Sequence, residues 1–439
     1  MKKNTYHIIT IGCQMNKADS ERVASFLEER AFELLPSSQE ANLVILTTCG
    51  VRQSAEDRAY GLVNQIRKAN PEATVVLTGC LAKRKDVMSR LKGQVDLFMP
   101  INELPNIFEL IKKSKSQKIL STDEVRASDG EKYLSIKPKY HSPFTAFVPV
   151  GNGCDNFCAY CVVPYARGRE VYRPLEEVVD EVEKLLAKGY KEIVLIAQNV
   201  NSFRSGEKNF PDLLRKVLAL PGEFWVRFSS SHPKDLSDEL ISLLADKKMC
   251  PHLHLALQSG DDEILARMNR KYTSDHFRKL IKRARELCPG LTVTTDVIVG
   301  FPGETEEQFE NSVKMFEELK FDLAYVSQYS PRPGTLSALM DNDVSKEEKE
   351  RRDKVLTKIL ACTGLEKNQA YLNKEVFVLV DGVNKKGKYF GKTASFKNVW
   401  LSVPKNILAT SLIGNFVKVK IVSVTDSGLE GELSDLKKG

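Results

Sequence analysis

Three closely spaced cysteines form the clearest chemical signal in the sequence. Cys154, Cys158 and Cys161 lie at intervals of four and three residues. This spacing gathers three thiolates around one point on a loop or helical turn. Three thiolates can hold three corners of a [4Fe–4S] cube while the fourth iron stays open for a ligand. A structural zinc site usually has four closed ligands, and the closest histidine is His141. The spacing therefore favours an iron–sulfur cluster.

A second set of three cysteines is spread over the first eighty residues. Cys13, Cys49 and Cys80 each stand at the carboxyl end of an apolar, β-rich run. The carboxyl ends of parallel strands share one edge of an open sheet, so we expect these thiols to converge. A single free cysteine is commonly just a buried side chain. Three at equivalent strand ends, beside a cluster motif, instead predict a second [4Fe–4S] site.

The remaining cysteines show no comparable pattern, and we interpret Cys250, Cys288 and Cys362 as structural. The total of nine is odd, and thiols stay reduced in the cytosol. A disulfide framework is therefore the poorer interpretation.

The elements that must position the cysteines can be predicted from hydrophobic patterns. In residues 1–116, β-rich runs alternate with helical patterns such as Ser20–Phe32 and Ala55–Ala69, which indicates an open parallel α/β sheet. The expected strands are Tyr6–Ile11, Leu43–Thr47, Thr74–Thr78 and Val95–Pro100. Residues 117–142 are polar and predict a linker.

Residues 143–372 carry a second βα series. Six strand–helix units in about 200 residues indicate a partial (βα)6 barrel, because eight units need about 250 residues. A charged helix, about Lys346–Leu372, should end this domain. The expected strands are Thr145–Val150, Glu192–Ala197, Trp225–Ser229, His252–Gln258, Thr292–Val299 and Ala324–Tyr329.

Residues 373–439 change character, and four short β-rich runs predict a small β-barrel. They are Glu375–Val380, Lys388–Thr393, Val399–Val403 and Val417–Val424. From Tyr371 to Gly439 there are eleven lysines and six acidic residues. A basic surface with interleaved aromatics suits an RNA loop. We expect Lys385, Lys386 and Lys388 to contact RNA, with further contributions from the other lysines and aromatics of this segment. These are Lys374, Lys392, Lys397, Tyr389, Phe390 and Phe396.

Polar residues at core strand ends are candidates for cofactor binding. Gln198 and Asn199 end the second core strand, and Gln258 and Ser259 follow another. Asp296 lies in an apolar strand, where an unpaired carboxylate would be costly. Strand-end turns or structural hydrogen bonds are the alternatives for these five residues.

Arg167 and Arg169, with Arg173, form a basic cluster after the Cys154–Cys161 loop. We predict a role for it in binding substrate or phosphate, with a solvated surface as the alternative.

Composition restricts the class of protein. The 439 residues are 42% hydrophobic and 28% charged, which is typical of globular domains. The net charge of +7 allows a nucleic-acid partner. No run approaches the roughly 18 apolar residues that span a bilayer, and the N-terminus lacks the apolar core of a secretory signal. We expect a cytoplasmic protein with no membrane association.

Several motifs resemble those of a known family. The Cys-x3-Cys-x2-Cys spacing, with Tyr160 before the last cysteine, is similar to the radical S-adenosylmethionine signature. Together with the N-terminal cysteines and the β tail, it resembles the methylthiotransferases over essentially the whole chain. The segments that carry the resemblance are Gly12–Asn16, Asp19–Glu21, Cys154–Arg169, Gln198–Ser202, Gln258–Gly260, Met268–Tyr272, Thr295–Glu304 and Tyr329–Thr335.

The resemblance implies a radical S-adenosylmethionine core and a C-terminal TRAM domain. It further implies that the open iron at Cys154, Cys158 and Cys161 binds S-adenosylmethionine. The candidates for residues near this cofactor are Tyr160, Gln198, Asn199, Gln258, Ser259 and Asp296. A second cluster at Cys13, Cys49 and Cys80 would deliver the methylthio sulfur.

The implied reaction adds a methylthio group to C2 of N6-isopentenyladenosine, next to the tRNA anticodon at position 37. Its partners would be the anticodon stem–loop and a low-potential electron donor such as flavodoxin or ferredoxin, with the enzyme a monomer. A radical is physically reasonable because adenine C2–H is not acidic and offers no leaving group, so acid–base or nucleophilic catalysis would be weak.

Two alternatives remain open from the sequence. The first is a methylthiotransferase acting on threonylcarbamoyl-adenosine in tRNA or on a ribosomal protein. The second, from another class, is a non-catalytic iron–sulfur protein whose β tail binds RNA. The second alternative predicts no 5′-deoxyadenosine from reduced protein and S-adenosylmethionine.

Overall fold

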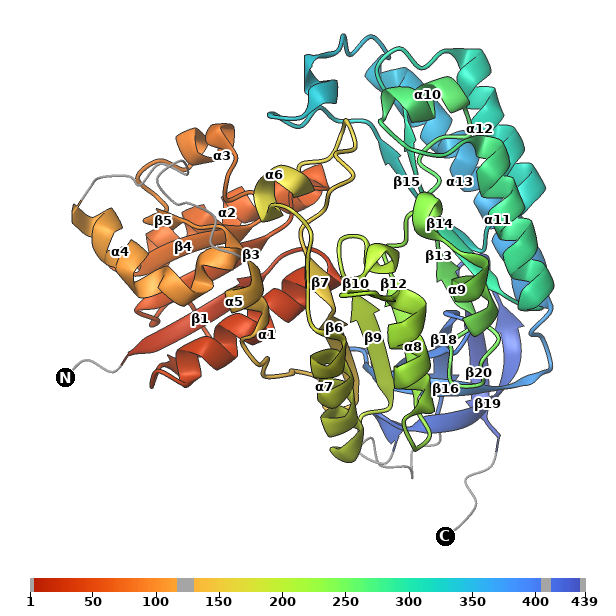
Figure 1. Ribbon diagram of the computed structural model, residues 1–439, viewed down its shortest axis with the longest axis horizontal. Helices are drawn as coiled ribbons and strands as arrows, with labels where there is room; N and C mark the ends of the chain where they lie inside the picture. The colour runs from red at the N-terminus through yellow and green to blue at the C-terminus, as the bar shows by residue number, and fades with distance from the viewer. Residues whose placement is uncertain (1–3, 117–129, 404–411, 435–439) are drawn as a thin grey trace.

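The computed structural model describes residues 4–116, 130–403 and 412–434 (Figure 1). Three folded units follow one another along the chain. The N-terminal unit lies beside the central unit, and the C-terminal barrel packs below the central strands. Among the described residues, no helix is long and apolar enough to cross a membrane.

The N-terminal unit is the predicted open parallel sheet. Its strands run in the order β2-β1-β3-β4-β5, and each pair is parallel. The strand β3 is buried throughout because helices cover both sheet faces. The bounds are β1 Thr5–Thr10, α1 Gln14–Glu28, β2 Glu33–Leu34, β3 Leu43–Thr48, α2 Gln53–Ala69, β4 Thr74–Gly79, α3 Lys85–Arg90, β5 Leu97–Phe98, η1 Ile101–Asn106 and α4 Ile107–Ser116.

Part of the expected linker is folded. Residues 117–129 lie outside the described residues, but α5 (Gly130–Leu134) packs on the N-terminal core through Tyr133 and Leu134. The Tyr133 hydroxyl also donates to the buried carboxylate of Asp19. The prediction of a linker is therefore wrong for residues 130–134, because two apolar side chains and one buried hydrogen bond fix them. A helix of five residues is too short to show a periodic pattern in the sequence.

The central unit is a partial barrel of six parallel strands. The strands β6-β9-β12 and β13-β14-β15 form two hydrogen-bonded groups, which the parallel bridge between Ser231 and Leu255 joins. Its strands and helices alternate as predicted. The bounds are β6 Thr145–Pro149, β7 Gly151–Asn152, α6 Val163–Arg167, β8 Val171–Tyr172, α7 Leu175–Ala187, β9 Glu192–Ile196, η2 Val200–Ser202, β10 Arg204–Ser205, β11 Lys208–Asn209, α8 Phe210–Ala219, β12 Trp225–Ser229, η3 Pro233–Asp235, α9 Asp238–Leu243, β13 His252–His254, α10 Asp262–Arg267, α11 Ser274–Leu287, β14 Thr292–Val299, α12 Glu306–Leu319, β15 Leu323–Gln328, η4 Leu336–Leu339 and α13 Lys346–Gln369.

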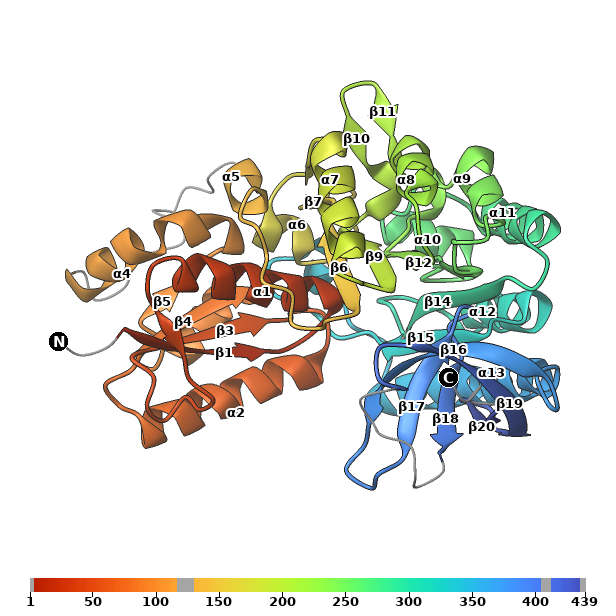
Figure 2. The same ribbon diagram turned by 90° about the horizontal axis from the view of Figure 1, so that it is seen from below.

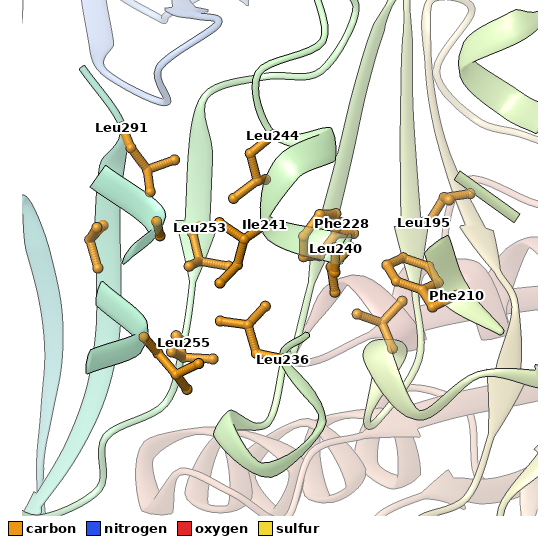
Figure 3. Close-up of a cluster of buried hydrophobic side chains, with 14 of the residues drawn as sticks. Leu195, Phe210, Phe228, Leu236, Leu240, Ile241, Leu244, Leu253, Leu255 and Leu291 are labelled. Atoms are coloured by element: carbon orange, nitrogen blue, oxygen red, sulfur yellow. The ribbon is translucent and has the colours of Figure 1, made fainter. Parts of the chain in front are cut away.

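Alternation along the central strands divides their side chains between two environments. Leu195, Phe228 and Leu253 belong to the large core that strands share with the surrounding helices (Figure 3). Val194 and Ile196 belong instead to a separate cluster with Met15 and Ala18 of α1. The N-terminal helix α1, which begins directly after Cys13, therefore packs on the strands of the central unit.

The C-terminal unit is a closed barrel in the order β16-β17-β18-β20-β19. The four predicted strands are present, and β20 was missed. Gly431 interrupts the apolar alternation of this strand, and glycine is needed there because a Cβ would come within 2.4 Å of Val419. The bounds are β16 Glu375–Val383, β17 Tyr389–Thr393, β18 Asn398–Ser402, β19 Phe416–Val424 and β20 Leu429–Leu433.

The C-terminal barrel lies against the central unit (Figure 2), and polar contacts join the two. Arg227 donates to the backbone oxygens of Ala394 and Thr393 at 2.8 Å each. The Lys397 ammonium donates to Asp322 Oδ1 at 2.8 Å. The ring of Phe396 stacks on that of His252 with centroids 4.2 Å apart. The expectation that Lys397 and Phe396 face RNA is therefore wrong, because both are used at this interface.

Candidate functional site: two thiol sets at a domain junction

The structure brings Cys13, Cys49 and Cys80 to one edge of the N-terminal sheet. They follow β1, β3 and β4, which are neighbours in the sheet. Gly12 approaches so closely that a Cβ on it would lie 2.5 Å from Cys49 Cβ. Gly50 in turn lies against Cys80, with a corresponding distance of 3.3 Å. The chain thus needs glycine where the three cysteine loops touch.

The electrostatics of these thiols reflect their closeness. Burial, together with the neighbouring Cys80 and Cys13, raises the pKa of Cys49 to about 11. Desolvation by the surrounding protein atoms also raises the pKa of Cys13, with Cys80 adding to the effect, although this residue still reaches solvent. Cys49 and Cys80 are buried, whereas Cys13 is exposed. The set is therefore crowded by protein yet open on the side of Cys13.

The second set lies on the loop after β7. Cys154, Cys158 and Cys161 are held by backbone bonds, including Cys154 N–H to the Gly168 oxygen at 3.1 Å. The segment 268–272 supports the loop from the opposite side. Arg270 Nη1 donates to Cys158 Sγ at 3.3 Å, and Asn269 donates to the Phe157 oxygen at 2.9 Å.

Arg270 is a further functional candidate. It lies in the Met268–Tyr272 segment that resembles the family, but it was not predicted as a site residue. Its guanidinium is buried and also donates to the Ala256 oxygen and to the Tyr272 hydroxyl. A cation held beside a thiolate stabilises the charged form. The pairing with Cys158 could not be read from the sequence, because 112 residues separate the two partners.

The two thiol sets face each other across the domain junction. Cys80 shares one buried cluster with Val162 and Ala166, which directly follow the second set. The pKa of Cys161 is raised by burial, then by Cys158 and Cys154, and also by Cys80 from the other set. Each set is thus the immediate electrostatic neighbour of the other.

The thiol sets suit clusters better than single ions. Within the described ranges, no group of three His, Cys, Asp or Glu side chains could hold one metal ion. In a four-iron cube each thiolate binds a different iron at a different corner, so its ligands need not converge on one point. Three-cysteine sets at crowded glycine-rich loops therefore fit [4Fe–4S] clusters.

Unsatisfied polar atoms mark the adjacent strand ends. Gln198 Oε1 and Asn199 Oδ1 after β9, and Ser231 Oγ after β12, are buried without a hydrogen-bond partner in the portion of the chain that is described. Buried polar groups are normally satisfied. These three atoms fit a polar ligand such as S-adenosylmethionine. Ser231 follows β12 and was not among the predicted strand-end cofactor residues, which follow β9 and β13 or lie within β14.

The other predicted cofactor residues lie around the same rim. Gln258 adopts a left-handed backbone conformation with φ 67°, which is uncommon for a non-glycine residue. Its neighbour Ser259 is fully buried and accepts from Asp261 N–H at 3.2 Å. Asp296 Oδ2 lies 3.0 Å from His254 Nε2. Tyr160 packs against a small cluster that includes Met268 and Phe301.

The two arginines predicted to bind substrate occupy different environments. Arg167 is buried, and its Nη2 pairs with Asp19 Oδ2 at 2.5 Å, with side-chain exposures of 2% and 1%. Arg167 Nη1 donates to Asn152 Oδ1 at 2.9 Å. Arg169 is 73% exposed and pairs with Asp155 at 3.2 Å. Arg167 therefore joins the helix after Cys13 to the Cys154–Cys161 loop, and only Arg169 is available to a substrate.

A groove opens beside the cysteine junction and reaches all three units. Its volume is about 850 Å3, and its lining includes Arg52, Tyr325, Gln328 and Asp426. Tyr325 is 40% exposed, and the Arg52 guanidinium carbon lies 5.7 Å from the centre of its ring. An exposed ring with a neighbouring cation can stack a nucleic-acid base.

The predicted RNA-binding lysines lie on the C-terminal barrel. Lys385 and Lys386 are exposed in the turn before β17. Lys388 pairs with Glu430 at 2.6 Å and lies 5.8 Å from the ring centre of Trp400. Trp400, which is 38% exposed, is an aromatic candidate that the sequence analysis missed.

Comparisons with known families define the class of protein. Residues 148–316 match the radical SAM superfamily, and residues 369–434 match the TRAM domain. Residues 5–100 match a family described as uncharacterized protein family UPF0004. The predicted radical S-adenosylmethionine core and TRAM barrel are thereby confirmed.

Curated relatives identify the family more closely. Proteins named tRNA-2-methylthio-N(6)-dimethylallyladenosine synthase are similar to this chain over 98% of its length. The one from Caldicellulosiruptor saccharolyticus is 39% identical, with 93% of its own length covered. The one from Syntrophomonas wolfei is also 39% identical, with 97% covered. The chain belongs to the tRNA-2-methylthio-N(6)-dimethylallyladenosine synthase family.

Solved structures agree with the fold. The radical S-adenosylmethionine methyltransferase TsrM from Kitasatospora setae gives a TM-score of 0.56 at 16% identity, covering 74% of this chain and 73% of that protein. The enzyme OxsB gives a TM-score of 0.52 at 13% identity, covering 80% and 56%. At these identities the likeness concerns the fold alone.

Proposed function

We propose that this protein is a radical S-adenosylmethionine methylthiotransferase. It replaces the C2 hydrogen of N6-isopentenyladenosine with a methylthio group at position 37 of tRNA. The names of its full-length relatives support the reaction and the substrate. The single observation in the structure that carries the proposal is the closeness of two separate three-cysteine sets, since Cys80 packs against Val162, the residue after Cys161.

Two [4Fe–4S] clusters are proposed as resident cofactors. Cys154, Cys158 and Cys161 would hold one, and Cys13, Cys49 and Cys80 the other. When bound, the first supplies an electron to S-adenosylmethionine and the second supplies sulfur. The chain's own residues would hold these groups. Arg270 donates to Cys158, and burial of Cys49, Cys80 and Cys154 limits the access of water to these thiols.

S-adenosylmethionine is proposed to lie at the carboxyl ends of the central strands. Gln198, Asn199 and Ser231 offer unsatisfied polar atoms there, and Gln258, Ser259 and Asp296 line the neighbouring strand ends. One molecule would supply the methyl group and a second the radical, which takes up the hydrogen from C2 as 5′-deoxyadenosine.

The groove beside the junction is the proposed entrance for the target nucleoside. Its lining includes Val51, two residues after Cys49, and Asp426 and Ser427 of the C-terminal barrel. The exposed ring of Tyr325 would receive a base. Lys385, Lys386 and Arg169 would contact phosphates of the anticodon stem–loop, while Lys388 is partly neutralised by Glu430.

The remaining assignments follow from this function. The auxiliary cluster would belong to residues 1–116 with the folded segment 130–134, the radical core to 143–372 and RNA binding to 373–439. We infer that the enzyme works as a monomer in the cytoplasm, where tRNA is modified. A flavodoxin or ferredoxin would supply low-potential electrons.

Nucleoside analysis of tRNA tests this function. A strain lacking the gene should accumulate N6-isopentenyladenosine, and the wild-type gene should restore its 2-methylthio form. Restoration by the Cys13→Ala/Cys49→Ala/Cys80→Ala variant would contradict the proposal. A change confined to threonylcarbamoyl-adenosine or to a ribosomal protein would instead favour the alternative substrates.

A further inference from the structure

Arg332 crosses from the central unit to the N-terminal cysteine loops. It lies between two prolines after β15 and is only 7% exposed. Its Nη1 donates to Gln53 Oε1 at 2.6 Å, and its Nη2 donates to the Val51 oxygen at 3.0 Å. Both partners lie within four residues of Cys49. The guanidinium therefore fixes the loop of this cysteine from outside the N-terminal unit.

The same arginine reaches a buried carboxylate that serves the third cysteine loop. Glu56 Oε2 lies 3.5 Å from Arg332 Nη1. Both carboxylate oxygens accept from Arg84, at 2.5 and 3.0 Å, and Arg84 lies four residues after Cys80. The Tyr60 hydroxyl donates to Glu56 at 2.6 Å. Glu56 thus joins the loops of Cys49 and Cys80 to each other and to the core.

A matching connection exists on the side of the first cysteine. Arg167, which ends the helix after Cys161, forms the buried pair with Asp19 of the helix after Cys13. The loops of Cys13 and Cys49 are therefore bonded directly to the central unit. The loop of Cys80 is bonded to Glu56, which itself contacts Arg332 of the central unit. The Arg332 connection is the one that serves Cys49 and Cys80.

We propose that Arg332 is a positioning residue that sets where Cys49 and Cys80 stand relative to the Cys154–Cys161 loop. The inference rests on the proposed function, in which the two cysteine sets act on one substrate. A planar guanidinium can make these two hydrogen bonds and the ion pair together, and lysine cannot reproduce that geometry. Reactions between fixed partners are sensitive to displacements of about 1 Å. Loosening this contact should therefore uncouple 5′-deoxyadenosine formation from formation of the methylthio product.

The Arg332→Gln variant tests the proposal. It should fold, because Glu56 keeps Arg84 and Tyr60 as partners. The reconstituted variant should retain its iron and its rate of 5′-deoxyadenosine formation. The ratio of 5′-deoxyadenosine to methylthio product should rise about tenfold or more, with the KM for tRNA changed less than about twofold. Arg332→Lys should be intermediate.

A second readout does not depend on the loaded enzyme. In apoprotein, alkylation of Cys49 and Cys80 should be faster in Arg332→Gln, while the buried Cys250 and Cys288 keep their rates. The control is Arg351→Gln on α13, whose arginine is 45% exposed and pairs with Glu306 and Glu348. It should leave both the product ratio and the alkylation rates unchanged.

The outcomes separate the inference from the proposed function. An unchanged product ratio in Arg332→Gln would overturn the inference, and so would a raised KM for tRNA at an unchanged ratio, since Arg332 would then act on the substrate. If wild-type protein makes no methylthio product, the proposed function fails. The alkylation rates alone then decide whether Arg332 holds the loops, and unchanged rates would refute it.

Discussion

Replacing Arg167 by Met should destabilise the protein strongly, because it removes one partner of a buried ion pair. The Arg167 and Asp19 side chains are 2% and 1% exposed. Removing one partner of such a pair typically costs about 3–5 kcal/mol, since the other charge stays buried without compensation. Among the described residues, Asp19 would keep only the Tyr133 hydroxyl as a side-chain hydrogen-bond donor. At about 2–4 °C per kcal/mol for domains of this size, the unfolding midpoint should fall by roughly 10 °C.

Arg169→Met provides the matched control, two residues along the same segment. Arg169 is 73% exposed, and its partner Asp155 is 39% exposed. Exposed pairs contribute about 0–1 kcal/mol, so calorimetry of this apoprotein variant should show a shift of at most about 4 °C. Weaker tRNA binding is expected for Arg169→Met, since its guanidinium is open to solvent.

The opposite pattern would refute the reasoning. If Arg167→Met unfolds at the same temperature as the wild type but binds tRNA more weakly, Arg167 is available to the substrate, as the sequence alone suggested. Asp19→Asn should show a loss of stability comparable to that of Arg167→Met. A stable Asp19→Asn variant would contradict the buried pair as well.

Two further predictions concern charge. Reversing Lys385 and Lys386 to Glu should weaken tRNA binding and reduce the slope of log affinity against log salt by about 1.5, at roughly 0.7–0.9 per phosphate contact, with S-adenosylmethionine cleavage unchanged. Lys184→Glu/Lys188→Glu, at the end of α7 and directly after it, is the control. Equal salt slopes in both variants would count against the barrel as the RNA-binding surface. Burial raises the pKa of Glu21 from 4.5 to about 7. Between these two pH values the folded state keeps a proton that the unfolded state has released. The stability of the folded state therefore falls as the pH rises from 4.5 through 7. Glu21→Gln should therefore stabilise by about 3 kcal/mol at pH 8 and by roughly 1 kcal/mol or less at pH 5, and equal gains in melting temperature at both pH values would contradict the raised pKa.

The sequence predicts those parts of the site that follow from strand order. Cys13, Cys49 and Cys80 could be grouped because each follows a β-rich run, and parallel strand ends share an edge. The loop of Cys154 to Cys161 is local, so its spacing is visible directly.

Contacts between domains could not be predicted in this way. Arg167 and Asp19 are 148 residues apart, and Arg332 and Gln53 are 279 apart. No periodic pattern connects such positions, and an arginine near a cluster motif gives the same signal whether it faces solvent or a buried carboxylate. Lys397 shows the same limit, since the charge count assigned it to RNA although it pairs with the buried Asp322.

The most direct test of the account measures iron and products in parallel for the two cysteine triple variants. Anaerobically reconstituted wild-type protein should bind about eight irons as two four-iron cubes, and each triple alanine variant should bind about half. The Cys154/Cys158/Cys161 variant should form no 5′-deoxyadenosine. The Cys13/Cys49/Cys80 variant should form 5′-deoxyadenosine but no methylthio nucleoside. Full iron in either variant, or methylthio product from the second, would contradict the division of labour between the two sites.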